Sequence, residues 1–497
     1  MNLRSSVELA GDAIRNPSSL GLGLVCFGLI GFGVSGCTFV VEPDDSTQPS
    51  LAFEAPTSSG GTTVQEPVEE ATQETPINVA PEALPAITES PEPPPAILFD
   101  PLILAETIVP VAEIAVGGAH VCALSYSGDV ACWGQNDVGQ LGYAHPWNIG
   151  DDEAVNDGGI VDVGASVVAL SAGDRHTCAL MDTNRLRCWG FGGDLALGRG
   201  NGHSETIGDD ETPADVGDAI IYSNAAFASL AAGDHHTCML NANGLVKCWG
   251  DSAEGALGYG YSTKTGGWLG QVAVGGSPVM SLTAGCEHTC AILDSGSVRC
   301  WGHSAALGYG GLENIGDNDT PNEFGDLDLG EPMVQIAAGH RHTCALTTDG
   351  SVRCWGMGGY GALGGGDTNS VLDAGEAAVV QIGDTVTQIA AGRRHTCALT
   401  AAGSVYCWGD GAFGALGYGN TQRVGDNETP IDAGAVQLGE AAVTIGAGDG
   451  FTCAIGESGQ VRCWGKGLGG RLGTGSEHNI GDDEVPASVP PLEIFVP

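Results

Sequence analysis

The chain has 497 residues and a formal net charge of −44, because 61 Asp and Glu residues stand against 17 Lys and Arg residues. Nucleic-acid affinity rests on Lys and Arg side chains that neutralise phosphates, so this charge excludes DNA and RNA as expected partners. A hydrophobic content of 42% excludes global disorder, and 81 Gly residues indicate many short strands and tight turns rather than helices.

Residues 1–36 have the pattern of an export signal. An apolar segment over residues 20–36 follows Arg4 and Arg15, and it is as long as a signal-peptide core but short for a membrane span. It ends in Val34-Ser35-Gly36-Cys37, which resembles the lipobox of bacterial lipoproteins. That resemblance implies cleavage before Cys37 and acylation of its thiol. The alternative is an ordinary or uncleaved signal peptide with an incidental cysteine.

Residues 37–103 are predicted to form an acidic, disordered tether. The segment 38–100 is rich in Pro, Glu, Ser and Thr and contains no Lys or Arg. Such a composition cannot bury enough apolar surface to offset the entropy of ordering. About 60 flexible residues span roughly 45 Å on average, so the tether would hold the domain of residues 104–497 away from a membrane. The N-terminal lipid would be its only attachment.

From residue 104 onward, one unit recurs seven times. Its clearest copy, residues 339–364, contains two cysteines ten residues apart, and Trp-Gly follows the second cysteine. A fixed period near 50 residues marks a repeat architecture, and the short strand-like runs favour a β-propeller over a helical solenoid. The prediction is an all-β fold, a seven-bladed β-propeller.

Each cysteine pair is predicted to be a disulfide across a β-hairpin. Thr348-Asp349-Gly350 is a three-residue turn that ends in the residue type suited to a left-handed conformation, and the other six repeats have Gly or Asn there. This turn places Cys344 opposite Cys354 in a non-hydrogen-bonded pair, at a separation that a disulfide accepts. The predicted disulfides are Cys122–Cys132, Cys178–Cys188, Cys238–Cys248, Cys290–Cys300, Cys344–Cys354, Cys397–Cys407 and Cys453–Cys463.

Seven disulfides imply an oxidising compartment, which agrees with an export signal. Zinc binding is the alternative for these cysteines, but the spacing is Cys-x9-Cys rather than the Cys-x2-Cys of zinc sites. Cys286 is left over. It is expected to be a buried or half-buried spare thiol, with a reactive thiol as the alternative.

The repeat resembles that of the regulator of chromosome condensation family. The resemblance rests on Gly392-Arg393-Arg394-His395-Thr396-Cys397-Ala398-Leu399, Gly403-Ser404-Val405-Tyr406-Cys407-Trp408-Gly409 and Gly414-Ala415-Leu416-Gly417. It covers residues 104–490 and implies a seven-bladed propeller with four-stranded blades that binds partners on a face or edge. The family includes a nuclear nucleotide-exchange factor for a small GTPase, ubiquitin-ligase and signalling proteins, and a secreted bacterial β-lactamase inhibitor. The export signal, paired cysteines and acidic surface of this chain depart from the nuclear member.

Two repeated features could hold a metal ion. A His stands two residues before the first cysteine in six repeats and Phe451 replaces it in the seventh, which favours a packing role over a metal site. Five repeats carry an acidic loop whose oxygens would suit Ca²⁺, although the ligand set is incomplete and an Asx-type turn is the alternative. The candidate ligands are Asp151, Glu153, Asp209, Glu211, Asp317, Asp319, Asp426, Glu428, Asp482 and Glu484. Apart from this calcium hypothesis, no cofactor is expected.

The third repeat lacks the acidic loop and carries Trp268, an exposed candidate anchor for a partner, with gap filling as the alternative. The run Ile494-Phe495-Val496 is a candidate strand for closing the ring against the first blade. No catalytic signature is found: the chain lacks a Gly-x-Ser-x-Gly elbow, a phosphate-binding Gly-Lys-Ser/Thr loop and a His-Glu-x-x-His motif.

Together these patterns predict a monomeric, extracytoplasmic binding module rather than an enzyme. It would be anchored to a bacterial membrane, at the outer membrane or cell surface of the cell envelope, and its partner would be a protein or a glycan. The alternatives are an inhibitor of a secreted enzyme and a guanine-nucleotide exchange factor-like regulator, the latter by family analogy.

Overall fold

The structure is a computed structural model that describes residues 110–267 and 270–495. The predicted signal segment, Cys37, the tether and Trp268 lie outside the described residues. Ala96–Pro497 is one compact unit. Within the described part of that unit, no helix is both long and apolar enough to span a membrane.

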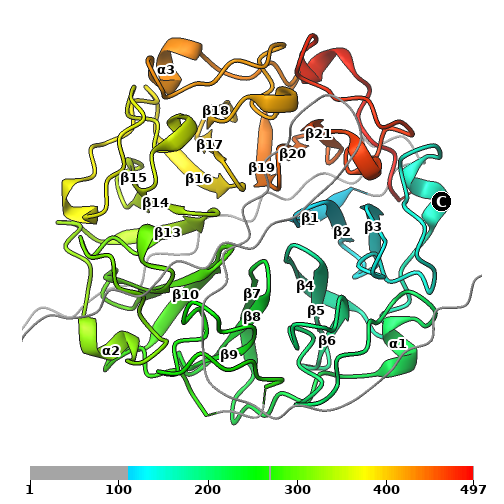
Figure 1. Ribbon diagram of the computed structural model, residues 1–497. Coiled ribbons are helices and arrows are strands. Elements are labelled where there is room, and N and C mark those ends of the chain that lie inside the picture. The colour runs from blue at the N-terminus through cyan, green and yellow to red at the C-terminus, as the bar shows by residue number, and fades with distance from the viewer. Residues whose placement is uncertain (1–109, 268–269, 496–497) are drawn as a thin grey trace, which may run out of the picture. The chain divides into compact units, whose positions relative to one another are not determined.

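Seven three-stranded antiparallel sheets, here called blades 1 to 7, are arranged around a common axis (Figure 1). In chain order the blades are β1–β3 (Val111–Val116, His120–Ser125, Val130–Gly134), β4–β6 (Val167–Ala172, His176–Met181, Leu186–Gly190), β7–β9 (Phe227–Ala232, His236–Asn241, Val246–Gly250), β10–β12 (Val279–Ala284, His288–Leu293, Val298–Gly302), β13–β15 (Met333–Ala338, His342–Thr347, Val352–Gly356), β16–β18 (Val386–Ala391, His395–Thr400, Val405–Gly409) and β19–β21 (Ala442–Ala447, Phe451–Gly456, Val461–Gly465). This confirms the seven-bladed all-β prediction.

Helices in the described residues are single turns between blades. They are α1 (Pro213–Val216), α2 (Pro321–Phe324) and α3 (Pro430–Ala433), with 3-10 turns η1 (Val155–Gly158), η2 (Ser304–Ala306), η3 (Gly359–Gly361), η4 (Ala374–Glu376), η5 (Ala412–Gly414), η6 (Leu468–Gly470) and η7 (Pro486–Ser488). Each α-helix starts with Pro after a Thr, where the missing N–H of proline costs nothing.

The predicted fourth strand is reduced to isolated residue pairs, one in each of five blades and two in blades 5 and 7, which add Arg353–Val379 and Val461–Leu492. In blade 1 the bridge joins Gly134 to Ile149, and equivalent bridges occur in the other six blades. Gly150 follows Ile149 with a φ of 92°, which turns the chain away from the sheet and ends the pairing. Regular pairing therefore stops at three strands.

The hairpin geometry follows the predicted register. Cys344 is paired with Cys354, and the turn position is occupied by Gly350 with a φ of 85° or, in blade 2, by Asn184 with a φ of 58°. All seven predicted cysteine pairs are bonded, with Cα–Cα distances of 4.0–4.1 Å. Each disulfide thus links the second and third strands of its own blade.

The repeated His forms a hydrogen bond to a Thr of the next blade, and this contact is here called the latch. The Trp249 indole N–H and the Thr237 hydroxyl both donate to the Ala196 carbonyl, at 2.7 and 2.9 Å. Because its only proton is used there, Thr237 must accept from Nε2–H of His176 in the preceding blade, at 2.8 Å. Six pairs at 2.8–2.9 Å share this contact: His120–Thr177, His176–Thr237, His236–Thr289, His288–Thr343, His342–Thr396 and His395–Thr452.

Blade 7 lacks the histidine of this contact, and blade 1 lacks the threonine that would be its partner. The latch from blade 7 would have to reach blade 1, where Val121 stands at the threonine position. Phe451 and Val121 are both fully buried, and the Arg471 guanidinium lies 5.7 Å from the Phe451 ring centroid. An apolar ring beside a cation is more favourable here than a histidine without its hydroxyl partner. The packing interpretation of the His position therefore agrees with the contacts.

The ring closes without a shared strand. Val111 N–H donates to Gly459 O at 3.1 Å, and Asp449 N–H donates to Gly118 O at 3.1 Å, so blade 1 meets blade 7 directly. Ile494 and Phe495, the described part of the run predicted as a closing strand, are buried but form no strand. Leu492 N–H donates to Val461 O at 2.8 Å within blade 7, which is the edge contact that Val436 makes to Val405 in blade 6.

Glu113, on the inner strand of blade 1, makes fewer hydrogen bonds to the next blade than its counterpart in blade 6. At the equivalent place in blade 6, the Gln388 amide accepts from Ile445 N–H and donates to Ile445 O, at 3.0 and 3.1 Å. Glu113 accepts from Leu170 N–H at 3.2 Å but has no proton to donate when ionised. Burial raises the pKa of Glu113, and the Leu170 hydrogen bond only partly opposes this.

We expect Glu113→Gln to stabilise the propeller at neutral pH. A raised carboxyl pKa means that Glu113 is most favourable at low pH, and that stability is lost as pH rises through the folded-state pKa. Glutamine removes this loss and adds a donor, so the gain should be about 1 kcal/mol at pH 7.5. Thermal unfolding at pH 7.5 and pH 4 measures it. An equal gain at both pH values would contradict the charge argument.

Candidate functional site

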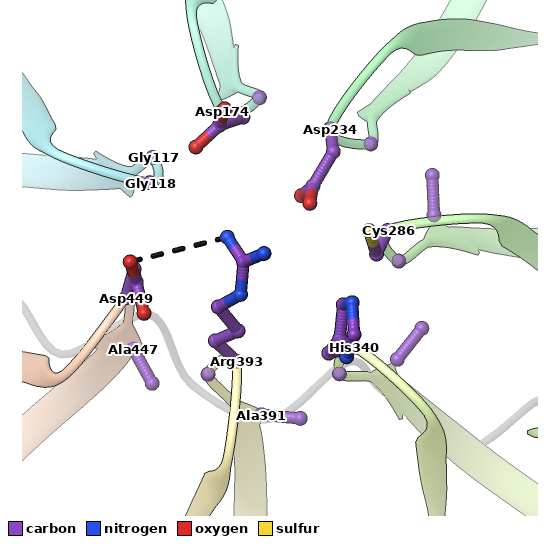
Figure 2. A pocket seen from close by; sticks show the side chains of 18 of the residues that line it. Gly117, Gly118, Asp174, Asp234, Cys286, His340, Ala391, Arg393, Ala447 and Asp449 are labelled. Atoms are coloured by element: carbon purple, nitrogen blue, oxygen red, sulfur yellow. Dashed lines mark ion pairs between the residues drawn. The ribbon is translucent and has the colours of Figure 1, made fainter. Parts of the chain in front are cut away.

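One end of the propeller axis is formed by the loops between the first and second strands of the blades (Figure 2). These loops line a cavity of about 110 Å³, here called the mouth. One mouth residue of each blade stands at the same repeat position, yet the residue types differ. They are Gly118, Asp174, Asp234, Cys286, His340, Arg393 and Asp449.

The mouth backbone is held rigidly by the glycine that precedes each of these residues. A Cβ on Gly392 would lie 2.4 Å from Cε1 of His395 and 2.5 Å from Gly448 O of the next blade. The blades meet through backbone hydrogen bonds at this level, such as Arg393 N–H to Gly448 O at 3.2 Å and Cys286 N–H to Gly339 O at 3.3 Å. The side chains that follow the glycines are therefore presented on a fixed ring.

This rigidity can be tested with two glycines of one propeller. Gly392→Ala should force the blade 6–7 contact apart and lower the unfolding free energy by roughly 2 kcal/mol or more. Gly365→Ala is the matched control, because a Cβ there meets nothing within 4 Å. Chemical denaturation of both variants checks the expectation. Similar losses in the two variants would show that the close approach is not what constrains Gly392.

The mouth carries three carboxylates around one guanidinium. Figure 2 shows Arg393 pointing between Asp174, Asp234 and Asp449, and its Nη1 lies 3.9 Å from Asp449 Oδ2. Burial raises the pKa of Asp174, and the charge of Asp234 adds to this, while Arg393 acts in the opposite direction. One cation thus compensates the three acids only in part.

Cys286 and His340 complete the mouth. Cys286 is the free cysteine among the described residues and is buried, as the sequence analysis expected of the spare thiol. Burial raises the pKa of the thiol strongly and the charge of Asp234 adds to it, so the nucleophilic thiolate is disfavoured. Burial and the neighbouring Arg393 lower the pKa of His340, which keeps its ring neutral.

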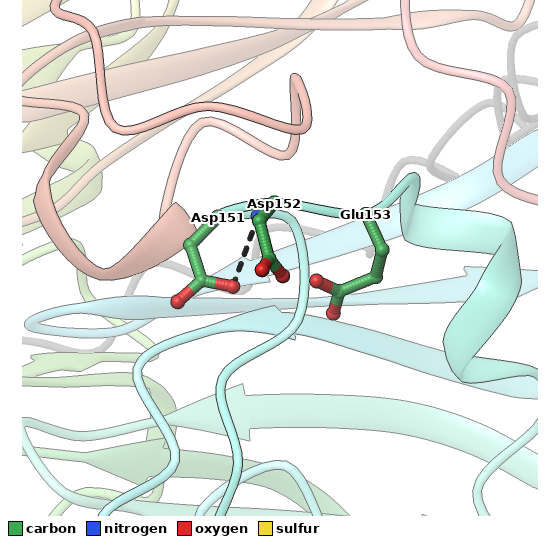
Figure 3. A group of neighbouring side chains, drawn as sticks. All are labelled: Asp151, Asp152 and Glu153. Carbon is green, nitrogen blue, oxygen red and sulfur yellow. Dashed lines mark hydrogen bonds between the residues drawn. The ribbon is translucent and has the colours of Figure 1, made fainter.

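The predicted calcium ligands lie at inter-blade turns away from the mouth. In three of the five loops the acidic side chains converge, with one ligand atom of each residue within 4.8 Å of the others: Asp151-Asp152-Glu153, Asp209-Asp210-Glu211 and Asp482-Asp483-Glu484. Figure 3 shows the first of these, in which Asp151 accepts from the Asp152 N–H at 3.1 Å. Asp317, Asp319, Asp426 and Glu428 lie in the remaining two loops, each of which has Asn at its centre.

These turns also have a role in packing. Gly475 N–H of blade 7 donates to Gly150 O at 3.1 Å, and Glu153 folds back to accept from Gly150 N–H at 3.3 Å. Bringing the acidic side chains of one turn together is electrostatically unfavourable, since burial and the neighbouring Asp210 raise the pKa of Glu211 to about 7. Calcium stays a prediction, and thermal unfolding in CaCl₂ against EDTA is the measurement that checks it.

Sequence reasoning missed most of the mouth. Among its residues the sequence analysis names only Cys286, although the position after each repeated glycine carries a usable signal, because it varies while the glycine before it recurs in all seven repeats. It also passed over Trp147, whose side chain is 71% exposed and lies 5.0 Å from His145 between ring centroids. Trp147 and Trp268 are the two tryptophans outside the repeated Trp-Gly slot.

Comparison with known proteins gives the same repeat. Residues 228–495 match the model of the RCC1-like domain, and residues 111–140 and 167–194 match the regulator of chromosome condensation (RCC1) repeat. The ultraviolet-B receptor UVR8 of Arabidopsis thaliana is 30% identical over 73% of this chain and 78% of its own length. The E3 ubiquitin-protein ligase HERC2 of Homo sapiens is 29% identical over 58% of this chain, which spans only 6% of that ligase.

Among solved structures, yeast RCC1 (Prp20) bound to Kap60 has a TM-score of 0.54 and 21% identity, over 68% of this chain and 78% of that one. This likeness concerns the fold. The family-model match over more than half of the chain and the likeness to UVR8 establish the relationship at the level of sequence. The chain therefore belongs to the regulator of chromosome condensation repeat family of β-propellers.

Proposed function

We propose that this chain is a protein-binding module that is exported, anchored through a lipid on Cys37, and held off the cell envelope by the segment 37–103. Membership of a family whose propellers bind proteins supports the first part. Structures of its yeast relative are described as bound to Kap60 and as tested for binding to Gsp1p and histones. The export pattern and the seven disulfides support the second part.

The single observation that carries the binding role is the loss of repetition at the mouth. The latch, the Trp-Gly slot and the hairpin cysteines recur around the ring, but the mouth position holds Gly, Asp, Cys, His and Arg. A residue needed only for packing recurs with the packing, as the six latch histidines do. Unlike side chains on an equivalent rigid backbone are what a specific contact surface needs.

A photo-crosslinking residue placed on each end of the propeller tests the binding role. Arg341, in the β13–β14 loop beside the mouth, is exposed, and so is Ala402 in the β17–β18 turn at the opposite end of its blade. We expect one protein adduct from native envelopes with the Arg341 replacement and not with that of Ala402. A captured hydrolase that is inhibited would select the inhibitor alternative, and a captured small GTPase the exchange factor. The same adducts from both positions would contradict the proposal.

Export and anchoring are tested by the intact mass of the native protein without reduction. The proposal expects a chain that starts at Cys37, carries acyl groups and has one free thiol, that of Cys286. An unprocessed N-terminus with reduced hairpin cysteines would overturn both the compartment and the anchor, while leaving the binding surface to the crosslinking experiment.

A further inference from the structure

Four of the chain's seventeen Lys and Arg residues lie in loops of blades 5 to 7 that follow the first or the third strand, at the end of the blades that carries the mouth. They alternate with large apolar side chains. We call this surface the cationic rim; it consists of Arg341, Met357, Tyr360, Arg394, Phe413, Arg423, Lys466 and Leu468. Met357, Phe413 and Leu468 are 43%, 47% and 53% exposed.

The aromatic residues of the rim are held in a backbone conformation that suits glycine. Tyr360 and Phe413 have φ angles of 65° and 61°, and the equivalent residue of blade 7 is Gly469 with a φ of 74°. A bulky side chain at such an angle is strained, and strain of this kind is retained where function requires the side chain. Core packing does not require Phe413, because about half of its surface is exposed.

Cations from the next blade lie over both rings. The guanidinium carbons of Arg394 and Arg423 are 5.0 and 4.7 Å from the Tyr360 ring centroid, and Lys466 Nζ is 5.5 Å from that of Phe413. Arg394 is 4.0 Å from Asp410. No ion pair within residues 110–267 and 270–495 neutralises the other three cations of the rim. Stacked guanidinium groups keep their N–H donors free to bind carboxylates.

We infer that the cationic rim binds an acidic polypeptide segment that alternates carboxylates with apolar side chains. The cations would pair with the carboxylates, and Phe413, Met357 and Leu468 would contact the apolar side chains. The inference rests on the proposed binding function and names its partner chemistry. A local group of four cations on a chain of net charge −44 favours a short acidic segment, because anionic membranes and nucleic acids would be repelled by the strongly acidic remainder of the chain.

The test exploits the strained backbone. The double variant Tyr360→Gly/Phe413→Gly gives blades 5 and 6 the glycine that blade 7 has at Gly469. The melting temperature of this variant should therefore be unchanged or higher than that of the wild type. Its affinity for a fluorescent 12-residue peptide that alternates Glu with Leu and Phe should fall at least tenfold. Tyr126→Gly, which removes an exposed aromatic residue at the opposite end of blade 1, is the matched control and should leave the affinity unchanged.

Fluorescence anisotropy at two salt concentrations completes the experiment. The wild type should bind more weakly at high salt, and a peptide with Gln in place of Glu should bind at least tenfold more weakly. Equal affinity of the wild type and the double glycine variant, or a lower melting temperature of that variant, would overturn the inference. Tighter binding of phosphatidylserine vesicles or heparin than of the peptide would also overturn it. So would a dimer of the wild type that the double glycine variant no longer forms. Failure here leaves the proposed function standing if the Arg341 crosslink still captures a protein.

Discussion

Reduction of the seven disulfides is expected to unfold the propeller at temperatures where the oxidised protein is fully folded. Each disulfide closes a hairpin loop whose cysteines are ten positions apart. In the chain-entropy model such a loop contributes about 2.8 kcal/mol by restricting the unfolded chain. Seven contributions of this size exceed the net stability of about 5–15 kcal/mol that is usual for a domain. The melting temperature should therefore fall by tens of degrees.

The measurement is thermal unfolding before and after reduction, with alkylation and mass spectrometry to verify that the hairpin thiols have reacted. Because the cysteines are buried, reduction needs a denaturant step followed by its removal. Cys344→Ala/Cys354→Ala should cost about 3 kcal/mol alone, which separates one blade's contribution from the collective effect. A fully alkylated protein that keeps its melting temperature would show that the latch and the apolar core suffice.

The hairpins could be predicted because their information is local. Ten residues separate the two cysteines, and the turn glycine between them sets the register, so no knowledge of other blades was required. The seven copies and their period near 50 residues then indicated the propeller, and the resemblance implied four strands per blade. The fourth strand was overestimated, because the glycine after Ile149 takes a φ of 92° and ends the pairing after one bridge.

Contacts between blades were harder to predict because their partners are more than 50 residues apart. His395 and Thr452 carry no mutual signal in a single hairpin. The signal becomes visible only when the two exceptions, Phe451 and Val121, are placed side by side by closing the ring. The mouth and the cationic rim needed the structure for the same reason, since Tyr360 and Arg423 come together only when adjacent blades are packed.

Acidification below about pH 6 is expected to destabilise the propeller through the six latch histidines. Burial lowers their pKa values to about 3 or about 4. Above the ordinary histidine pKa of 6.5 both states are neutral and the latch adds no pH dependence. Below it the unfolded chain binds protons that the folded latch refuses, so stability falls until the folded-state pKa values are reached. Each histidine contributes a slope of about 1.4 kcal/mol per pH unit.

Carboxyl groups with raised pKa values, among them Glu113, Asp174 and Glu211, act in the opposite direction, so a single latch must be isolated. Thr452→Val leaves the His395 Nε2–H buried without an acceptor and should cost about 1–3 kcal/mol. Adding His395→Phe reproduces the Phe451–Val121 pair. The surroundings permit the phenylalanine ring, because the two rings already pack equally closely against a glycine. A Cβ added to Gly448 would lie 2.2 Å from Cε1 of Phe451, and one added to Gly392 would lie 2.4 Å from Cε1 of His395.

The double variant should recover part of the stability lost by Thr452→Val and should respond less to acid. Its unfolding free energy, measured by denaturation from pH 6 to pH 4.5, should fall by about 1.4 kcal/mol less per pH unit than that of the wild type. The equality of those two slopes would contradict a neutral, proton-excluding latch. A double variant no more stable than Thr452→Val would instead show that His395 packs in a way that phenylalanine cannot reproduce, so that the exception at the ring closure depends on Arg471 beside Phe451.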